Sequence, residues 1–292
     1  MRVGHRDRLI GRRRDLSLNG LVEISAEVRA QALEFTACGP DPPAELGMQR
    51  ITTPHYVLMV TPMPSVTFFA RLRVEGADIE AVVAEVREVI RGLGRTQATW
   101  LVGPMSTPPG LADALRGLGF VPHTEPPLEP TATCLAIVGA PDADVPPGIE
   151  IRLADSAELL ADAYEVSARA FGMSTEDGEA LAATIPTRLR LQEEGSLRLR
   201  DWIAYVDGKP AAAARGSLVE HGINLSGAAV LPEGRGRGLY RALIAERWRE
   251  AVERGTPALT VQAGEMSAPI LRKLGFVEVG TAMCLLDRLE PA

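Results

Sequence analysis

The order of apolar and polar positions divides the second half of the chain into alternating strands and helices. Residues 148–154 form one predicted strand, and residues 200–230 form three more, joined by hairpin turns at "DGK" and "HGIN". Apolar positions recur every three or four residues in three predicted helices, Ser156–Phe171, Glu176–Gln192 and Leu239–Arg254. The segments "ALTVQA", Ser267–Leu274 and "TAMCLLDRL" follow as strand, helix and strand. This mixture predicts an α/β fold with helices on both faces of a sheet.

Three short blocks of the first half recur in the same order in the second half. "GPMSTP", "LRGLGFV" and "TATCL" correspond to "GEMSAP", "LRKLGFV" and "TAMCL", and 14 of the 18 paired positions are identical. Ordered similarity of this kind indicates two copies of one fold. We therefore expect a flexible tail over 1–20, a first copy over 21–140, a linker over 141–148 and a second copy over 149–292.

Composition and charge narrow the class of protein. The chain has 292 residues, of which 46% are hydrophobic and 24% charged, as expected for a globular protein with buried cores. The net charge of −7 counts against general nucleic-acid binding, and no apolar run reaches the roughly 18–20 residues that cross a membrane. The arginine-rich start, "MRVGHRDRLIGRRRD", lacks the apolar core of a secretory signal. We interpret it as a solvated tail, with a transit peptide as the alternative.

The cysteines indicate neither disulfides nor metal binding. Cys38, Cys134 and Cys284 are widely spaced and odd in number. Cys134 and Cys284 occupy equivalent places in the two copies, inside short apolar strands, so we expect them to be buried core residues rather than nucleophiles. A reducing, cytoplasmic setting and the absence of a bound metal follow from this pattern.

The stretch "AAVLPEGRGRGLYRALIAERW" joins a strand that ends at Val230 to a helix that begins at Leu239. The first turn of a helix carries free N–H groups and the positive end of the helix dipole. Glycines let the preceding loop curl around an anion, and Arg235 and Arg237 add positive charge, so the stretch predicts a diphosphate cradle. The alternative is a flexible turn with solvated arginines. A P-loop is excluded because no Lys-Ser/Thr pair follows, and a dinucleotide fingerprint lacks its third glycine.

Residues 149–289 resemble the GNAT (GCN5-related N-acetyltransferase) superfamily. Its members carry Arg/Gln-x-x-Gly-x-Gly/Ala between the fourth strand and the third helix, here "RGRGLY" after "VLP", and a later helix that ends in Leu-Gly-Phe, here "ILRKLGF". The resemblance implies two tandem GNAT-like domains, each a mixed, mostly antiparallel sheet flanked by helices, with acetyl-CoA as co-substrate. The residues it implies for acetyl-CoA binding are Ala228, Ala229, Val230, Arg235, Gly236, Arg237, Gly238, Leu239, Tyr240 and Ser267.

The sequence departs from the family at the two positions that usually carry protons. The common glutamate base, about six residues before Val230, is Asn224 here, and the common tyrosine acid is Leu271. Neither side chain can do that work. The candidates for other catalytic roles are Ser267, Asn224 and Ser226, the last two on one face of their strand. For Ser267 we favour the simpler interpretation, a helix N-cap.

Two further regions bear on the acceptor. By resemblance, Tyr164–Glu179 corresponds to the acceptor-pocket helices, where Glu176, Asp177 and Glu179 either attract an amine or form a solvated face. In the first copy, Val74–Gly92 keeps the helix but loses the glycines and arginines, and its Asp78 and Glu80 would repel a diphosphate. We interpret the first copy as degenerate, contributing packing or a wall of the acceptor site.

Together these features predict a bacterial acyl-CoA-dependent N-acyltransferase. It would move an acetyl group from acetyl-CoA to a small-molecule or peptide amine, with no nucleic-acid or membrane partner. An acyl-CoA-binding pseudoenzyme with a regulatory or scaffold role is the alternative, and a purely structural protein is a third possibility. The sequence leaves open the acceptor, the acyl chain and the choice between monomer and homodimer.

Overall fold

The computed structural model describes residues 23–39, 41–125 and 128–289, so the tail predicted over 1–20 lies outside the described residues. The first half begins with short helices and then alternates strands and helices. Its elements are α1 (Ala26–Leu33), α2 (Phe35–Cys38), η1 (Ala44–Leu46), β1 (Gln49–Thr52), β2 (Tyr56–Val60), β3 (Thr67–Leu72), α3 (Ile79–Gly92), β4 (Gln97–Val102), α4 (Leu111–Gly117), β5 (Val121–Pro122) and β6 (Thr131–Ile137).

The second half repeats that pattern with one additional strand, β7, at its start. Its elements are β7 (Ile149–Leu153), α5 (Ala157–Phe171), α6 (Thr175–Ala182), α7 (Ile185–Glu193), β8 (Leu199–Val206), β9 (Lys209–Val219), β10 (Gly222–Val230), η2 (Pro232–Gly234), α8 (Leu239–Glu253), β11 (Leu259–Ala263), α9 (Ala268–Lys273) and β12 (Val277–Arg288). Most of these bounds agree with the predicted ones to within a few residues. The helix predicted over Glu176–Gln192 is wrong, because it is two helices. The second of them begins at Ile185–Pro186, where proline suits the first turn of a new helix but not the interior of a long one.

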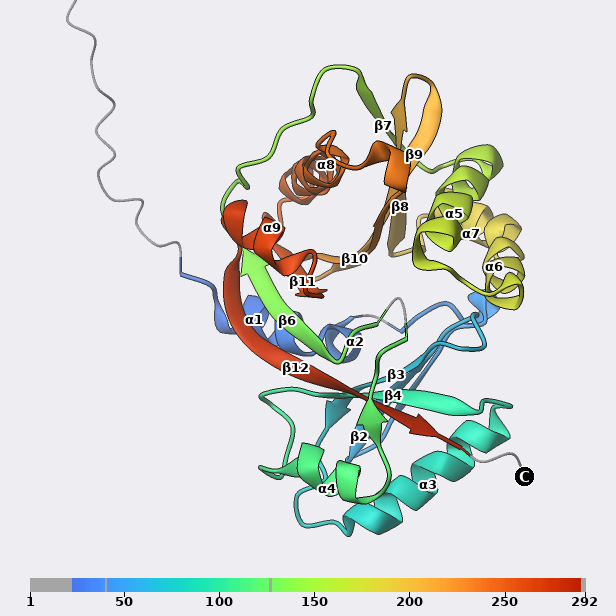
Figure 1. Cartoon of the computed structure of the whole chain (residues 1–292), viewed down its shortest axis with the longest axis vertical. Coiled ribbons are helices and arrows are strands. Elements are labelled where there is room, and N and C mark those ends of the chain that lie inside the picture. Colours follow the sequence, from blue (N-terminus) through green and yellow to red (C-terminus); the bar gives the residue numbers. More distant parts are fainter. Residues whose placement is uncertain (1–22, 40, 126–127, 290–292) are drawn as a thin grey trace, which may run out of the picture.

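All the described strands join one twisted sheet in the order β1-β2-β3-β4-β12-β6-β11-β10-β9-β8-β7, with β5 paired to β12. Two neighbouring pairs are parallel, β3–β4 and β10–β11, and the other pairs are antiparallel. Helices α5–α7 cover one face of the second half, and α8 and α9 cover the other (Figure 1). The fold is therefore the predicted mixed, mostly antiparallel sheet flanked by helices.

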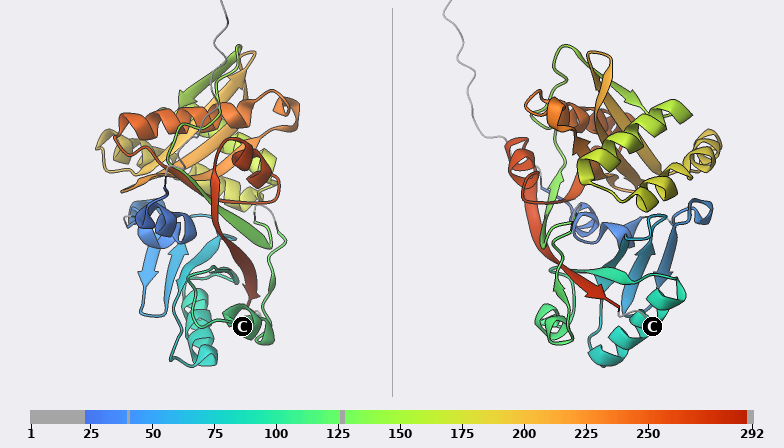
Figure 2. Two further views of the ribbon diagram at one scale, coloured as in Figure 1. Left: turned by 90° about the vertical axis from the view of Figure 1, so that its left-hand side faces the viewer. Right: turned by 45° about the vertical axis from the view of Figure 1, so that its right-hand side comes forward.

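The two halves exchange their last strands. β6, from the first half, pairs with β11 of the second half, whereas the end of β12 pairs with β4 of the first half. Between these contacts β6 and β12 pair with each other, so that the repeated blocks "TATCL" and "TAMCL" run side by side in opposite directions. Figure 2 shows β12 running from the second half into the first. Each half therefore needs a strand of the other half to complete its sheet.

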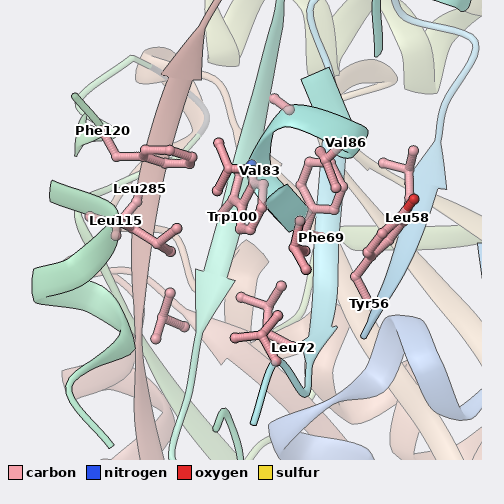
Figure 3. Close-up of a cluster of buried hydrophobic side chains, with 14 of the residues drawn as sticks. Tyr56, Leu58, Phe69, Leu72, Val83, Val86, Trp100, Leu115, Phe120 and Leu285 are labelled. Carbon is pink, nitrogen blue, oxygen red and sulfur yellow. The ribbon is translucent and has the colours of Figure 1, made fainter. Parts of the chain in front are cut away.

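The exchange also appears in the cores. Leu285, on β12, is buried in the core of the first half together with Phe69, Trp100, Leu115 and Phe120 (Figure 3). The Phe69 and Trp100 rings lie 4.7 Å apart between centroids, and Trp100 meets Phe120 edge to face at 5.0 Å. Because aromatic side chains bury the largest apolar areas, this cluster fixes the end of β12 in the first half. The halves are thus joined by apolar packing as well as by strand pairing.

Candidate functional site

In the second half, two parallel strands separate and leave a wedge between them. β10 pairs with β11 only from Ile223 to Leu225, yet it remains paired with β9 as far as Val230. A bulge follows Ser226, where Gly227 adopts φ +55°, a left-handed conformation that suits glycine. Beyond the bulge, β10 has no strand partner on its β11 side among the described residues. An extended ligand can therefore use this edge as a strand would.

The corresponding wedge in the first half is closed by the chain itself. Thr107 donates its N–H to the carbonyl of Leu72 at 3.2 Å and accepts the N–H of Val74 at 3.0 Å, forming a parallel bridge opposite Arg73. In the repeat, Thr107 corresponds to Ala268, whose N–H instead bonds to the carbonyl of Gly264 within its own turn. The same backbone edge is therefore occupied in the first half and open in the second.

The helix that follows each wedge, α3 in the first half and α8 in the second, also differs in whether its N-terminal N–H groups are free. Asp78 precedes α3, and its carboxylate accepts hydrogen bonds from the N–H groups of Glu80 at 2.9 Å and Ala81 at 3.4 Å. Gly238 precedes α8 with φ +84° and offers no capping side chain. The first-turn N–H groups of α8 thus remain available to an external anion, whereas those of α3 already bind an internal one.

The predicted cradle residues surround that open helix end. Gly236 adopts φ +76°, and a Cβ at that position would meet nothing within 4 Å, so the loop is open there. Arg235 is exposed and forms no ion pair within the described part of the chain, while Arg237 lies 3.3 Å from the Asp207 carboxylate at the surface. At Gly238 a side chain would meet Pro146 of the linker at 2.9 Å. The loop therefore combines open space with one unpaired cation.

Asn224 has a structural role, because it links neighbouring elements through a buried hydrogen bond. It is buried, and its Nδ2 donates to Thr260 Oγ1 on β11 at 3.0 Å. Gln31, on α1, donates to the same oxygen at 3.0 Å. These two hydrogen bonds to one oxygen tie β10, β11 and α1 together at the closed end of the wedge, and they hold the Asn224 amide in place.

Ser267 and Tyr240 meet on the α8 side of the wedge. Burial raises the pKa of the Tyr240 phenol, whereas Arg247 and the Ser267 hydroxyl act to lower it. The Ser267 side chain does not cap α9; its hydroxyl donates to the Gly264 carbonyl at 3.3 Å. Tyr240 packs against the core cluster that contains Leu271, which is fully buried. A phenol from α8 therefore lies next to the start of α9, although α9 carries none.

Arg247, which the sequence analysis missed, lies beneath the bulge. Its side chain is fully buried, its Nε donates to the Leu243 carbonyl at 2.9 Å, and its Nη1 donates to the Arg215 carbonyl at 3.2 Å. Arg215 is the β9 residue opposite Ser226. Burial lowers the pKa of Arg247 to about 10, which still leaves it charged at neutral pH. The sequence did not single out Arg247, because an arginine in an amphipathic helix is usually exposed. Only the tertiary structure places it under the bulge.

A second buried cluster lies on the opposite face of the sheet. Asp201, on β8, accepts hydrogen bonds from Arg188 of α7 and from Arg215 Nε at 2.8 Å. Both guanidinium groups also lie over the Tyr164 ring, at 5.9 and 5.6 Å from its centroid. Two cations thus share one carboxylate, and this cluster too was absent from the sequence analysis.

The acidic residues considered for an acceptor amine are dispersed. Asp177 is buried and accepts hydrogen bonds from Ser65, in the β2–β3 loop, and from Ser174 at 2.9 Å. Glu176 and Glu179 are exposed. Asp177 therefore fastens α6 to the first half, and the two glutamates form a solvated face.

The described residues also bear on the predictions about cysteines, metal binding and membrane spans. Cys134 and Cys284 are free and buried, and burial raises the pKa of the first thiol to about 11 and of the second to about 12. Within the described ranges no group of three or more His, Cys, Asp and Glu side chains is arranged to hold a metal ion. None of the described helices is long and apolar enough to cross a membrane.

Comparison with known proteins agrees with this geometry. Residues 161–276 match the sequence model of the Acetyltransferase (GNAT) family. The whole fold is similar to a GCN5-related N-acetyltransferase from Kribbella flavida, with a TM-score of 0.60 and 17% identity over 89% of this chain and 95% of that one. A tandem GNAT protein from the clavulanic acid biosynthesis pathway gives 0.55 and 15%, covering 91% and 95%. A GCN5-related N-acetyltransferase from Sphaerobacter thermophilus gives 0.56 and 17%, covering 82% of each chain. No curated protein matches the sequence.

The wedge, the bulge and the open helix end all lie in the part of the chain that matches the GNAT family model. The second half of this chain contains a GNAT domain, and the chain as a whole has a fold like that of a tandem GNAT protein.

Proposed function

We propose that the protein is an acyl-CoA-dependent N-acyltransferase that moves an acetyl group from acetyl-CoA to an amine, with one CoA site per chain. The observation that carries this proposal is the contrast between the halves. The wedge and helix end of the second half are open, whereas Thr107 and Asp78 close those of the first half. A glycine-rich turn alone, without that contrast, would be weak support for a CoA site.

The residues around the open wedge fit the chemical parts of acetyl-CoA. The free edge of Ala228–Val230 suits the amide groups of a pantetheine arm, which can pair with it as a strand. The diphosphate would meet the first turn of α8, with Gly236 and Gly238 giving room and Arg235 and Arg237 giving charge. Leu239 and Tyr240 begin that turn.

The bound thioester supplies an activated acyl group, so this chain needs only to position it and to manage charge and protons. Backbone N–H groups near Ala229 and Val230, at the end of β10, would polarise the thioester carbonyl. The buried charge of Arg247 lies below the same bulge and favours negative charge developing there.

In this proposal Tyr240 donates the proton to the departing sulfur. Its raised pKa keeps the phenol protonated at neutral and moderately alkaline pH, and Ser267 lies beside it to orient the hydroxyl. Asn224 takes no part in proton transfer in this scheme because its amide is buried and bonded to Thr260. The amine loses its proton to water. Ser226 is the residue of β10 that carries a hydroxyl group.

An acyl-CoA-binding pseudoenzyme remains the second candidate. A specific observation favours it: the position of the family's base is an amide held in a buried hydrogen bond, and the position of its acid is a fully buried leucine. Such a protein would bind acetyl-CoA through the same wedge but would not consume it.

Release of free CoA distinguishes the two candidates. The protein is incubated with acetyl-CoA and a panel of primary amines, and the new thiol is measured with and without each amine. An enzyme releases CoA in an amine-dependent manner, and the acetylated amine appears in equal amount. Tight acetyl-CoA binding without amine-dependent release for any acceptor would establish the pseudoenzyme, whereas failure to bind acetyl-CoA would rule out both.

A further inference from the structure

A small cavity lies at the seam between the two halves, on the face of the sheet covered by α5–α7. It has a volume of about 60 Å³. From the first half it is lined by the β2–β3 loop, by η1 and by Met48, which precedes β1, and from the second half by α6, α7, β8 and β9. A site needs roughly 10–15 Å³ to hold one water, so this cavity can take a carboxylate with a short stretch of carbon chain. Asp177 and Ser65, hydrogen-bonded across the same seam, hold its two walls together.

The polar end of the cavity is positively charged. Arg188 and Arg215 line it, while none of the ten lining residues is Asp or Glu. Asp201 neutralises only one of the two guanidinium groups. Arg188 is 97% buried, because its exposed fraction is 3%, and its Nε has no hydrogen-bond acceptor within the described part of the chain. A buried cation without a full set of acceptors is costly, so the site favours an anion.

The remaining walls are mostly apolar, with Thr61 and Thr184 as the polar exceptions, and come from both halves. Met63 and Leu46 contribute from the first half, and Leu181 and Leu199 from the second. A ligand with an aliphatic or aromatic body next to its anionic group fits such a lining better than an inorganic anion does.

One residue that lines the cavity, Arg215, also lies next to the bulge of the wedge. Arg215 lies on β9 directly opposite Ser226, and its Cβ is 3.7 Å from where a Cβ of Gly227 would lie. A molecule whose anionic end contacts Arg215 would therefore lie close to the bulge, where the acyl group of a bound thioester is expected.

We propose that this cavity is the carboxylate subsite for the acceptor, and that the acceptor is a small amino carboxylate such as an amino acid. This inference rests on the proposed function and names its substrate class. It also assigns a role to the first half, which supplies a wall of the acceptor site although its own wedge is closed.

The test uses calorimetric titration of the full chain with glycine, leucine and phenylalanine and with the carboxamide of each. At least one acid should bind about tenfold or more tightly than its amide, because the amide cannot pair with a guanidinium group as an anion does. Arg188→Gln should reduce that preference to less than about threefold. Arg190→Gln, in the same helix but in exposed ion pairs with Glu45 and Glu194, should leave it unchanged.

Met63→Phe provides a second variant that leaves the charges intact. By filling the cavity from the first half, it should abolish binding of the acid while both arginines remain in place. Equal binding of acids and amides, binding of none of the three acids, or a preference that survives both Arg188→Gln and Met63→Phe would overturn the proposal. Acetyl-CoA affinity is measured on the same samples. Its absence in wild type alongside acid-selective binding would overturn the proposed function and leave the subsite standing.

Discussion

Arg73 and Thr107 form a parallel bridge that closes the strand wedge of the first half, at the place where the second half leaves its wedge open. The two halves share a fold, so the difference is local. The bridge uses the edge of the chain from Leu72 to Val74, which corresponds to Ala228–Val230 in the repeat. One half of the molecule therefore serves as an internal comparison for the other.

Reversing the charge at Arg235 should weaken acetyl-CoA binding. Arg235 is exposed and unpaired among the described residues, so Arg235→Glu perturbs little of the folded structure while placing a negative charge at the diphosphate position. We expect the affinity to fall by about 10- to 100-fold, the range for losing a hydrogen bond to a charged group. The measurement is equilibrium binding. Arg91→Glu, the same charge change at an exposed position of α3, is the control. Equal affinities for the two variants would contradict the assignment.

Removing the cap of α3 should cost stability without creating a CoA site. Asp78→Ala deletes the side chain that accepts the N–H groups of Glu80 and Ala81, which typically costs about 1 kcal/mol. The wedge remains closed by Thr107, so acetyl-CoA stoichiometry should not change. Urea unfolding and calorimetry on the same variant check both statements, and the appearance of a second binding site would show that Asp78 alone had blocked it.

The sequence predicted the local structure well wherever a short pattern decided it. The glycine–arginine loop, the helix after it and the repeated blocks all lie where periodicity and turn residues placed them. Proline in "TIPTR" signalled a helix start that was overlooked, since Pro186 lies in the first turn of α7.

Long-range pairing could not be predicted in the same way. The exchange of β6 and β12 depends on which of two nearly identical strands each sheet edge receives, and "TATCL" and "TAMCL" carry almost the same local pattern. The buried cluster of Arg188, Arg215 and Asp201 assembles from α7, β9 and β8. Charged residues in a sequence predict exposure, so only the tertiary structure identifies these as buried.

Tyr240→Phe should lower the turnover rate and change little else. If the phenol protonates the departing sulfur, its loss should reduce kcat about 10- to 100-fold, at the low end for general acid catalysis because a thiol leaves readily. Ser267→Ala should cost about tenfold. Leu271→Tyr should destabilise the fold, since Leu271 is fully buried and a larger side chain would overpack the core. An unchanged kcat in Tyr240→Phe would remove this residue from the mechanism.

The pH dependence of wild type follows from the same residue. Burial raises the pKa of Tyr240 above its ordinary value of 10, so the acid stays protonated through pH 8–9. The rate should rise with pH as the free amine accumulates, without a falling limb in that range. A sharp decrease between pH 8 and 9 would show that a different acid, with a lower pKa, controls the reaction.

Asp201 should contribute stability that is lost at low pH. Burial alone would raise its pKa, but Arg215 and Arg188 together hold the pKa below its ordinary value. A carboxyl group with a lowered pKa stabilises the fold above about pH 4 and loses that contribution as the pH falls through its native pKa. Asp201→Asn should therefore cost about 3 kcal/mol at pH 7, and the difference from wild type should shrink toward pH 3. Urea unfolding across that range is the measurement, and a constant difference would contradict the ion-pair assignment.

The second half of the molecule is proposed to bind acetyl-CoA, and the first half is not. Calorimetric titration of the full chain with acetyl-CoA measures the number of sites. One site per chain is expected, and Arg235→Glu should weaken that site while Asp78→Ala leaves the stoichiometry at one. Two equivalent sites, or no detectable binding, would disprove the proposal.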